Sequence, residues 1–292
     1  MPTIAVNDID ICYESFGPDD GPPLLLVMGL GAQMTFWHTG FVSELVDRGF
    51  RVIRFDNRDV GLSSKSVGDP PDVMSIYAQA LAGEPVEAQY TLSTMAADAA
   101  GLLDALSVPA AHIVGASLGG MVSQMIAIDH PDRVLSLTSI MSTTGAGDVG
   151  QPDAAAIGAL LTPPPTERAA AIESSVSLGK VIAGPLFDED EARARATESY
   201  DRCFHPAGSA FQIAAVAATG DRTERLQGLD VPCLVIHGRA DPLVTLSGGV
   251  ATAEAVPGAD LLVLGHMGHD MPKIYWPQIA DAILGIAERS TD

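Results

Sequence analysis

The sequence predicts an α/β fold with a mostly parallel eight-stranded sheet, helices on both faces of the sheet and a helical cap insertion. Two observations support this prediction. Short apolar runs alternate with helical patterns along most of the chain, which is typical of a parallel sheet covered on both faces. The alternation stops before the seventh run, where a long segment rich in Gly, Pro and Ala indicates an inserted unit.

Eight segments have the length and apolar character of strands. The first two are expected to form an antiparallel hairpin at one edge of the sheet, because Asn7 and Asp8 supply a turn between them. The predicted strands are 3–7, 9–15, 23–28, 51–56, 111–116, 133–142, 231–237 and 259–264. Helices are predicted between most of them, including 41–48, 92–106, 119–130 and 275–289.

The length of 292 residues and a hydrophobic content of 47% allow one large core with an insertion. We expect residues 1–143 and 220–292 to form this core domain. Residues 144–219 are expected to form a helical cap above the strand ends, because they contain no strand-like run. Within the cap, a Thr-Pro-Pro-Pro break at 162–165 precedes a charged helix at 188–202.

Two features bear on the walls of a cleft above the strands. Residues 64–90 form a second long excursion with several prolines, which predicts a pocket wall, a mobile lip or a solvated loop. Met141 stands just before the cap segment and Phe211 near its end. Both are candidates for lining the pocket, although core packing is the simpler interpretation of each.

A serine stands where a strand is predicted to turn sharply into a helix. The segment 115–119 reads Gly-Ala-Ser-Leu-Gly, with Ser117 at its centre. Such a turn holds the serine in a strained backbone with its hydroxyl pointing toward a cleft. Its glycines are needed because side chains there would collide as strand and helix fold back. We interpret Ser117 as a nucleophile; the alternative is a Gly- and Ser-rich turn without chemistry.

A serine hydroxyl is a poor nucleophile at neutral pH and needs a base that is oriented by a third group. After a turn of this kind, the acid and the histidine follow in that order along the chain. Asp241 is the candidate acid, because it lies just beyond the strand predicted at 231–237, where ligands bind in open parallel sheets. An ordinary Asp-Pro turn is the alternative for Asp241.

His269 is the candidate base, since it follows the strand predicted at 259–264. A general base must come within about 3 Å of the serine oxygen. Gly268 suits that close approach, which favours His269 over His266. The other histidines lie beside strand cores or in helical and cap-like segments, and we interpret them as structural: His38, His112, His130, His205 and His237.

Backbone N–H groups are also needed to bind the oxyanion that forms on an attacked carbonyl. One donor is expected from Leu118, directly after the serine. Leu30 is assigned as the second, because it lies in a Gly-rich loop after the strand predicted at 23–28. A plain Gly-rich turn is the alternative for that loop. Four loops at four strand ends therefore carry the required groups in the required order.

These motifs resemble those of the α/β-hydrolase superfamily over nearly the whole chain. Within it, the sequence most resembles the esterases typified by aclacinomycin methylesterases, which share its Val-Met-Gly run. The resemblance implies a catalytic triad of Ser117, Asp241 and His269 and an oxyanion hole of Leu30 and Leu118. The matching segments are Met-Gly-Leu-Gly at 28–31, the Asp-X-Arg-Asp-X-Gly-X-Ser turn at 56–63, the serine turn at 115–119, Gly-X-X-Asp at 238–241 and Gly-His at 268–269.

Two departures from the superfamily pattern stand out. Met28 replaces a usual histidine, so a side-chain hydrogen bond that helps to shape the oxyanion loop is lost. Asp59 replaces a glycine, and we expect it to be held by Arg58 or by a backbone contact. Ser117 argues against haloalkane dehalogenases and epoxide hydrolases, which carry an aspartate at that turn. Carbon–carbon bond hydrolases, cofactor-free perhydrolases and non-catalytic binding modules on the same scaffold stay open.

Composition narrows the function further. A net charge of −21 and only three lysines argue against nucleic-acid partners and anionic membrane surfaces. No apolar run is long enough to span a bilayer, and residues 1–8 do not resemble a secretory signal. Three scattered cysteines suit a reducing cytoplasm. No dinucleotide fingerprint, phosphate loop or metal cluster is apparent, so no cofactor is expected.

Together these observations predict a cytoplasmic carboxylic-ester hydrolase. Its partners would be a small-to-medium ester and water, and its chemistry would pass through an acyl-enzyme at Ser117. A homo-oligomer is compatible with the sequence, which does not otherwise bear on assembly.

Overall fold

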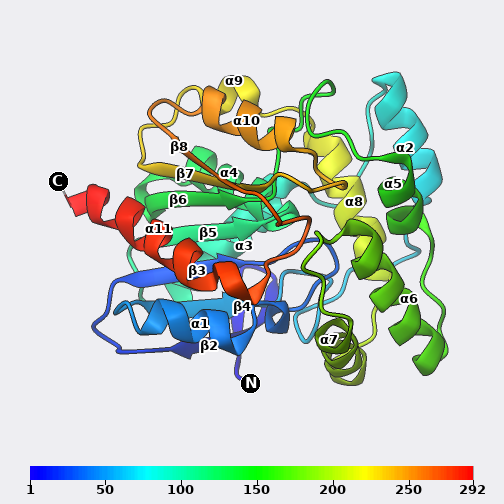
Figure 1. Cartoon of the computed structure of the whole chain (residues 1–292), viewed down its shortest axis with the longest axis horizontal. Coiled ribbons are helices and arrows are strands. Elements are labelled where there is room, and N and C mark those ends of the chain that lie inside the picture. The colour runs from blue at the N-terminus through cyan, green and yellow to red at the C-terminus, as the bar shows by residue number, and fades with distance from the viewer. Residues whose placement is uncertain (292) are drawn as a thin grey trace.

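The computed structural model describes residues 1–291, and its eight strands form one sheet (Figure 1). The strand order across the sheet is β1-β2-β4-β3-β5-β6-β7-β8. Every pair from β4 to β8 is parallel, whereas β1–β2 and β2–β4 are antiparallel. The predicted fold class is confirmed. The strands are β1 (Thr3–Val6), β2 (Ile9–Phe16), β3 (Pro23–Val27), β4 (Arg51–Phe55), β5 (Ala111–Ala116), β6 (Val134–Ile140), β7 (Cys233–Gly238) and β8 (Asp260–Leu264).

The edge hairpin forms where it is predicted. Val6 on β1 faces Ile9 on β2 across a turn of Asn7 and Asp8. Asn7 has φ +52°, a left-handed conformation that asparagine tolerates better than most residues. This turn reverses the chain at the sheet edge.

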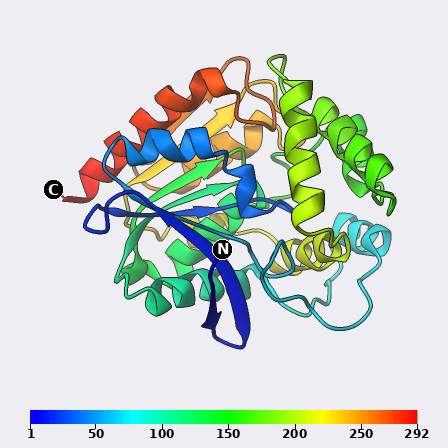
Figure 2. The same cartoon turned by 90° about the horizontal axis from the view of Figure 1, so that it is seen from below.

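Two helical layers cover the sheet because its central strands are apolar on both sides. Leu24 and Leu26 of β3 point to one face, and Leu25 and Val27 point to the other; all four are fully buried. Figure 2 shows α1 (Thr39–Val46) and α11 (Trp276–Glu288) on the first face, with α3 (Leu92–Ala105) and α4 (Leu118–Asp129) on the opposite one. The remaining helix on this second face is α10 (Leu246–Ala255), and α9 (Thr223–Leu226) lies next to it.

Five helices lie between β6 and β7: the short α9 named above and four helices that lie beside the sheet in Figure 1. The first, α5 (Ala154–Leu161), precedes the Pro-rich break, and α6 (Arg168–Ile182) follows it. The charged helix predicted at 188–202 is α7 (Glu189–Arg202), and α8 (Ala207–Thr219) leads back to the sheet. The division into a core of 1–143 and 220–292 and a cap of 144–219 stays a prediction. We use "cap helices" below for α5 to α8.

The start of α7 shows why its charged sequence is helical. Asp188 accepts a hydrogen bond from the Glu191 N–H, which satisfies one of the free donors of the first turn. Three acidic residues then occupy that turn, and Arg202 ends the helix. This arrangement of charge matches the helix dipole.

The excursion at 64–90 contains a helix, α2 (Val73–Ala82). Asp72 caps its first turn by accepting the Met74 N–H at 3.0 Å, and Gly83 ends it with φ +69°. The helix packs against α8. Within residues 1–291, no helix is both long enough and apolar enough to cross a bilayer.

A buried histidine lies in β5, the strand that leads to Ser117. His112 is 4% exposed, and its Nδ1 lies 2.8 Å from Ser136 Oγ on β6. Burial lowers its pKa to about 4, because the charged ring would lose its hydration. The unfolded chain takes up a proton on this residue below about pH 6.5, whereas the folded chain does so only near pH 4. Stability is therefore lost as the pH falls through this window.

Replacing this histidine should reduce the acid sensitivity of the fold. In His112→Asn, we expect the drop in unfolding free energy between pH 7 and pH 4 to be smaller by on the order of 3 kcal/mol than in the wild type. Urea denaturation at both pH values measures this difference. His266→Asn, at an exposed position, is the control for loss of a histidine. An equal reduction in that control would contradict the prediction.

Candidate active site

Ser117 occupies the sharp connection between β5 and α4. Its backbone has φ +57° and ψ −122°, a region that non-glycine residues rarely adopt. The turn is held from the neighbouring strand, because Ser117 N–H donates to the Ile140 carbonyl at 2.9 Å. Ser142 Oγ in turn donates to the Ser117 carbonyl at 2.8 Å. The strained serine is thus fixed by hydrogen bonds to the end of β6 and the residues that follow it.

The glycines of this turn are required by close packing. A Cβ on Gly115 would overlap the Gly119 carbonyl oxygen, and a Cβ on Gly119 would overlap the Val27 carbonyl oxygen. The first contact lies within the turn, and the second joins the turn to β3. Only glycine allows strand, turn and helix to approach so closely here.

Asp241 lies just beyond the end of β7 and is 4% exposed. Its Oδ1 accepts the backbone N–H groups of Leu243 and Val244, each at 2.9 Å. Its Oδ2 lies 2.8 Å from His269 Nδ1. A carboxylate can only accept, so His269 carries its proton on Nδ1 whenever Asp241 is ionised. The Asp-Pro turn is present, and it also aims the carboxylate at the histidine.

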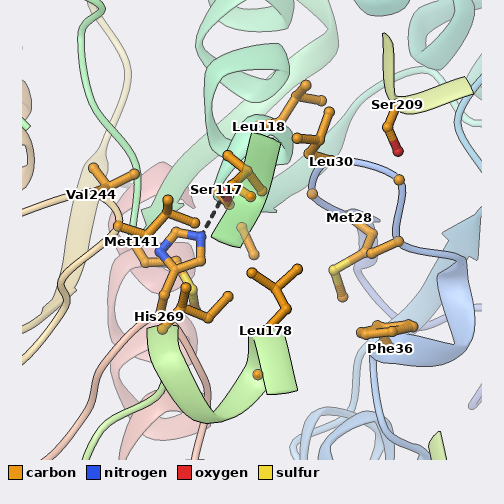
Figure 3. A pocket seen from close by; sticks show the side chains of 18 of the residues that line it. Met28, Leu30, Phe36, Ser117, Leu118, Met141, Leu178, Ser209, Val244 and His269 are labelled. Carbon is orange, nitrogen blue, oxygen red and sulfur yellow. Dashed lines mark hydrogen bonds between the residues drawn. The ribbon is translucent and has the colours of Figure 1, made fainter. Parts of the chain in front are cut away.

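His269 connects Asp241 to the serine. Its Nε2 lies 2.9 Å from Ser117 Oγ, although the two residues are 152 positions apart in the chain (Figure 3). The backbone of His269 donates to the Ile182 carbonyl at 2.8 Å, at the end of α6. Gly268 also contacts the cap helices, since a Cβ there would overlap the Gly184 nitrogen. The close approach that this glycine permits is therefore to the α6–α7 connection.

The competing histidines lie elsewhere. His266 is exposed, and its backbone N–H donates to the Tyr275 hydroxyl at 3.3 Å. His237 is fully buried on β7, and its Nε2 donates to the Val244 carbonyl at 2.8 Å. Burial lowers the His237 pKa, so this ring stays neutral beside Asp241.

A second carboxylate, Asp270, follows His269 directly. Its Oδ1 accepts the N–H groups of Gly184 at 3.0 Å and Gly268 at 2.9 Å. Burial raises the pKa of this carboxyl, and the two N–H groups partly oppose that effect. Asp270 therefore ties the histidine loop to the cap helices, whereas Asp241 contacts the imidazole.

The loop after β3 lies against the serine turn. A Cβ on Gly29 would come within 3.2 Å of the Ala116 carbonyl oxygen and of Ser117 Cβ. Among residues 1–291, neither the Leu30 nor the Leu118 N–H donates to a protein acceptor. Both predicted donors are thus available near Ser117.

A cavity of about 1290 Å³ lies above Ser117 and His269 (Figure 3). Its walls are mainly apolar, with Leu178 from α6 on the cap side. The helix α2 also lines it, so the excursion at 64–90 contributes a pocket wall. Met141 lines this cavity, whereas Phe211 belongs to the hydrophobic core with α3 and α4. The residues labelled on the core side are Met28, Leu30, Phe36, Leu118, Met141 and Val244.

The turn that carries Asp59 is held by a backbone contact, one of the two expected possibilities. Asp59 accepts the N–H and the hydroxyl of Ser66, at 2.5 and 2.8 Å, and the Tyr90 hydroxyl at 2.7 Å. Arg58 instead pairs with Asp98 at 2.5 Å. These hydrogen bonds hold Asp59 in a left-handed conformation, with φ +68°, that glycine adopts more readily.

Two side chains that contact the 28–31 loop were not predicted from the sequence. Asn57 donates to the Met28 carbonyl at 2.9 Å. Gln212, on α8, accepts the Gly31 N–H at 2.9 Å. The histidine missing at position 28 could have signalled a substitute donor or acceptor, but no motif marks either residue.

Comparison with known proteins settles the family. A model of the alpha/beta hydrolase fold family matches residues 22–272. The chain belongs to this family. The predicted membership in the α/β-hydrolase superfamily is confirmed.

Relatives of this α/β hydrolase include esterases. Rhodomycin D methylesterase from Streptomyces sp. (strain C5) is 28% identical, and the alignment covers 100% of both chains. The 3-oxoadipate enol-lactonase 2 of Acinetobacter baylyi is 27% identical over 90% of this chain and 87% of its own. A solved meta-cleavage product hydrolase from Pseudomonas fluorescens IP01 has the same fold, with a TM-score of 0.78, 21% identity and coverage of 99% and 98%. The predicted resemblance to methylesterases is confirmed.

The backbone strain at Ser117 has a measurable consequence. Ser117→Gly and Ser117→Ala both remove the hydroxyl, but only glycine relieves the positive φ. Glycine also raises the conformational entropy of the unfolded chain, which partly offsets the relief of strain. We therefore expect the unfolding free energy of Ser117→Gly to exceed that of Ser117→Ala by about 1 kcal/mol. Urea denaturation of both variants measures this difference. An alanine variant of equal or greater stability would contradict the prediction.

Proposed function

We propose that this α/β hydrolase is a carboxylic-ester hydrolase with Ser117 as nucleophile, His269 as general base and acid, and Asp241 as the group that orients His269. The observation that carries the proposal is the continuous chain of hydrogen bonds from Asp241 through His269 to Ser117, at 2.8 and 2.9 Å. It ends at the floor of the cavity. Relatives named for ester and lactone cleavage support the same chemistry.

In the first step, Ser117 Oγ attacks the ester carbonyl as its proton passes to His269 Nε2. Asp241 stabilises the imidazolium that forms and holds Nδ1 protonated, so Nε2 is the free base at the start. The carbonyl electron pair moves to oxygen, where the N–H groups of Leu30 and Leu118 bind it. The tetrahedral intermediate then collapses, and the alcohol leaves with the proton from His269.

Hydrolysis of the acyl-enzyme repeats these steps with water as the attacking group. His269 takes a proton from water, and the new oxyanion occupies the same pair of N–H groups. Collapse breaks the bond to Ser117 Oγ and releases the carboxylic acid. No group beyond these residues and water is required.

The cavity favours esters with an apolar body. Its walls are mainly apolar, and its volume of about 1290 Å³ is larger than that of most small-molecule pockets. We therefore propose that the preferred esters extend beyond the small-to-medium range expected from the sequence. Activity over a panel of esters that vary in acyl and alcohol size tests this size range.

The alternative is a hydrolase of carbon–carbon bonds, which uses the same serine and histidine. The meta-cleavage product hydrolase shares the fold at a TM-score of 0.78. Turnover of 1,5-diketone-type substrates in the absence of ester turnover would favour this alternative.

Loss of the serine hydroxyl should abolish ester hydrolysis. In Ser117→Ala, we expect turnover of p-nitrophenyl acetate to fall by at least about 10³-fold, because the attacking oxygen is gone. The control is Ser123→Ala, on the helix α4 that follows Ser117, whose hydroxyl donates to the Gly119 carbonyl. We expect this control to stay within a few-fold of the wild type. Wild-type turnover in Ser117→Ala would refute the proposed function.

Asp241 should matter for turnover much more than for stability. In Asp241→Asn, the amide oxygen can still accept the N–H groups of Leu243 and Val244, so the melting temperature should change little. The imidazole loses its orienting acceptor, and we expect kcat to fall by about 10³- to 10⁴-fold. Steady-state kinetics and thermal denaturation measure the two effects. A larger kinetic loss in Asp270→Asn would assign the orienting role to Asp270 instead.

A further inference from the structure

We propose that Gln212 of α8 is a positioning residue that fixes the orientation of the Leu30 N–H. This inference rests on the proposed function, in which that N–H binds the oxyanion. It assigns a role in the chemistry to a cap helix that contributes none of the three proposed triad residues.

The Gln212 side chain is wholly buried and both ends of its amide are used. Its Oε1 accepts the Gly31 N–H at 2.9 Å, and its Nε2 donates to the Arg58 carbonyl at 3.0 Å. An N–H can only donate and a carbonyl can only accept, so these partners determine which way the amide faces. Gln212 therefore joins the 28–31 loop to the turn that follows β4.

The peptide on the other side of the loop is held as well. Asn57 is 2% exposed, and its Nδ2 donates to the Met28 carbonyl at 2.9 Å. The Met28–Gly29 peptide is thus fixed through its oxygen, and the Leu30–Gly31 peptide is fixed through its nitrogen. Between them lies the Gly29–Leu30 peptide, whose carbonyl accepts the Ala32 N–H at 3.2 Å. Its own N–H is the proposed oxyanion donor.

The loop needs such anchors because its own sequence does not restrict it. Gly29 and Gly31 flank Leu30, and Gly31 has φ +62°. Glycine adopts many backbone conformations, so the Gly29–Leu30 peptide, which carries the Leu30 N–H, can rotate at little cost unless its neighbours are fixed. Met28 offers no polar side chain to the loop. The hydrogen bonds of Asn57 and Gln212 restrain the two neighbouring peptides, in addition to the Ala32 N–H that contacts the Gly29 carbonyl.

The face of α8 that carries Gln212 is in direct contact with the loop. Ser209 lies one turn earlier on α8, and a Cβ on Gly31 would overlap its Oγ. Figure 3 shows Ser209 beside the loop that carries Leu30. A movement of α8 away from the loop would therefore break the hydrogen bond between Gln212 and the Gly31 N–H. Assembly of the oxyanion hole thus depends on the seating of this cap helix.

The test compares two buried glutamines. Gln212→Met removes both polar ends and keeps a similar volume. Its matched control is Gln124→Met: Gln124 is also wholly buried, accepts from Arg222 Nε at 3.0 Å and donates to the Thr143 carbonyl at 3.3 Å. Active sites are counted by fluorophosphonate titration, so that loss of folded protein does not appear as loss of kcat.

In Gln212→Met, we expect kcat per active site to fall by about 10- to 100-fold with little change in KM, because the donor is misaligned but not removed. Binding of a trifluoromethyl ketone should weaken by the same factor. In that adduct Ser117 Oγ bonds to the carbonyl carbon, the proton passes to His269, and the carbonyl electron pair becomes an oxyanion in the hole. Gln124→Met should be less stable than the wild type but keep the wild-type kcat per active site and the wild-type affinity for the ketone.

Wild-type kcat and wild-type ketone affinity in folded Gln212→Met would overturn the proposal. If that variant yields no active sites, Gln212→Leu takes its place: its side chain cannot accept the Gly31 N–H, so kcat and ketone affinity should again fall together. Wild-type values there would also overturn it. Wild-type protein that takes up no fluorophosphonate at Ser117 would instead contradict the proposed function.

Discussion

Parallel pairing of the central strands is the constraint on which the rest of the structure depends. Because β3, β5, β7 and β8 run in one direction, their carboxyl ends meet at one edge of the sheet. Loops that are far apart in the chain become neighbours there. Ser117 follows β5 directly, and the loop after the edge strand β8 extends to bring His269 to it.

Polar contacts, as well as apolar packing, attach the cap helices to this edge. Arg202 at the end of α7 pairs with Asp56 at 2.7 Å in a buried site. Gln212 reaches the loop after β3, and Gly184 reaches the histidine loop through Asp270. Buried polar groups are costly when unpaired, so these contacts favour one arrangement of the cap over others. These contacts connect the loop after β3 and the histidine loop to residues between β6 and β7.

The sequence predicted the parts of this site that depend on local pattern. Apolar runs located every strand to within a few residues, and short motifs identified Ser117, Asp241 and His269, which the structure brings together. Gln212 and Asn57 were missed because their role comes from partners 181 and 29 positions away. Asn57 stands at a variable position of the 56–63 motif, and no motif includes Gln212. For residues 64–90 the sequence allows three interpretations and does not single out the helix α2. The prolines and the glycine of this segment suggest a loop, but they lie outside the helix.

One wall of the cavity is formed by the helix α5, which contains only four types of apolar residue. The helix α5 consists only of Ala, Ile, Gly and Leu, and it lines the cavity without joining the hydrogen-bonded chain that begins at Asp241. Substitutions among such residues change the available space by one or a few methylene groups. Selection can therefore retune which molecules this enzyme accepts by small steps in α5, while the reacting groups keep their alignment.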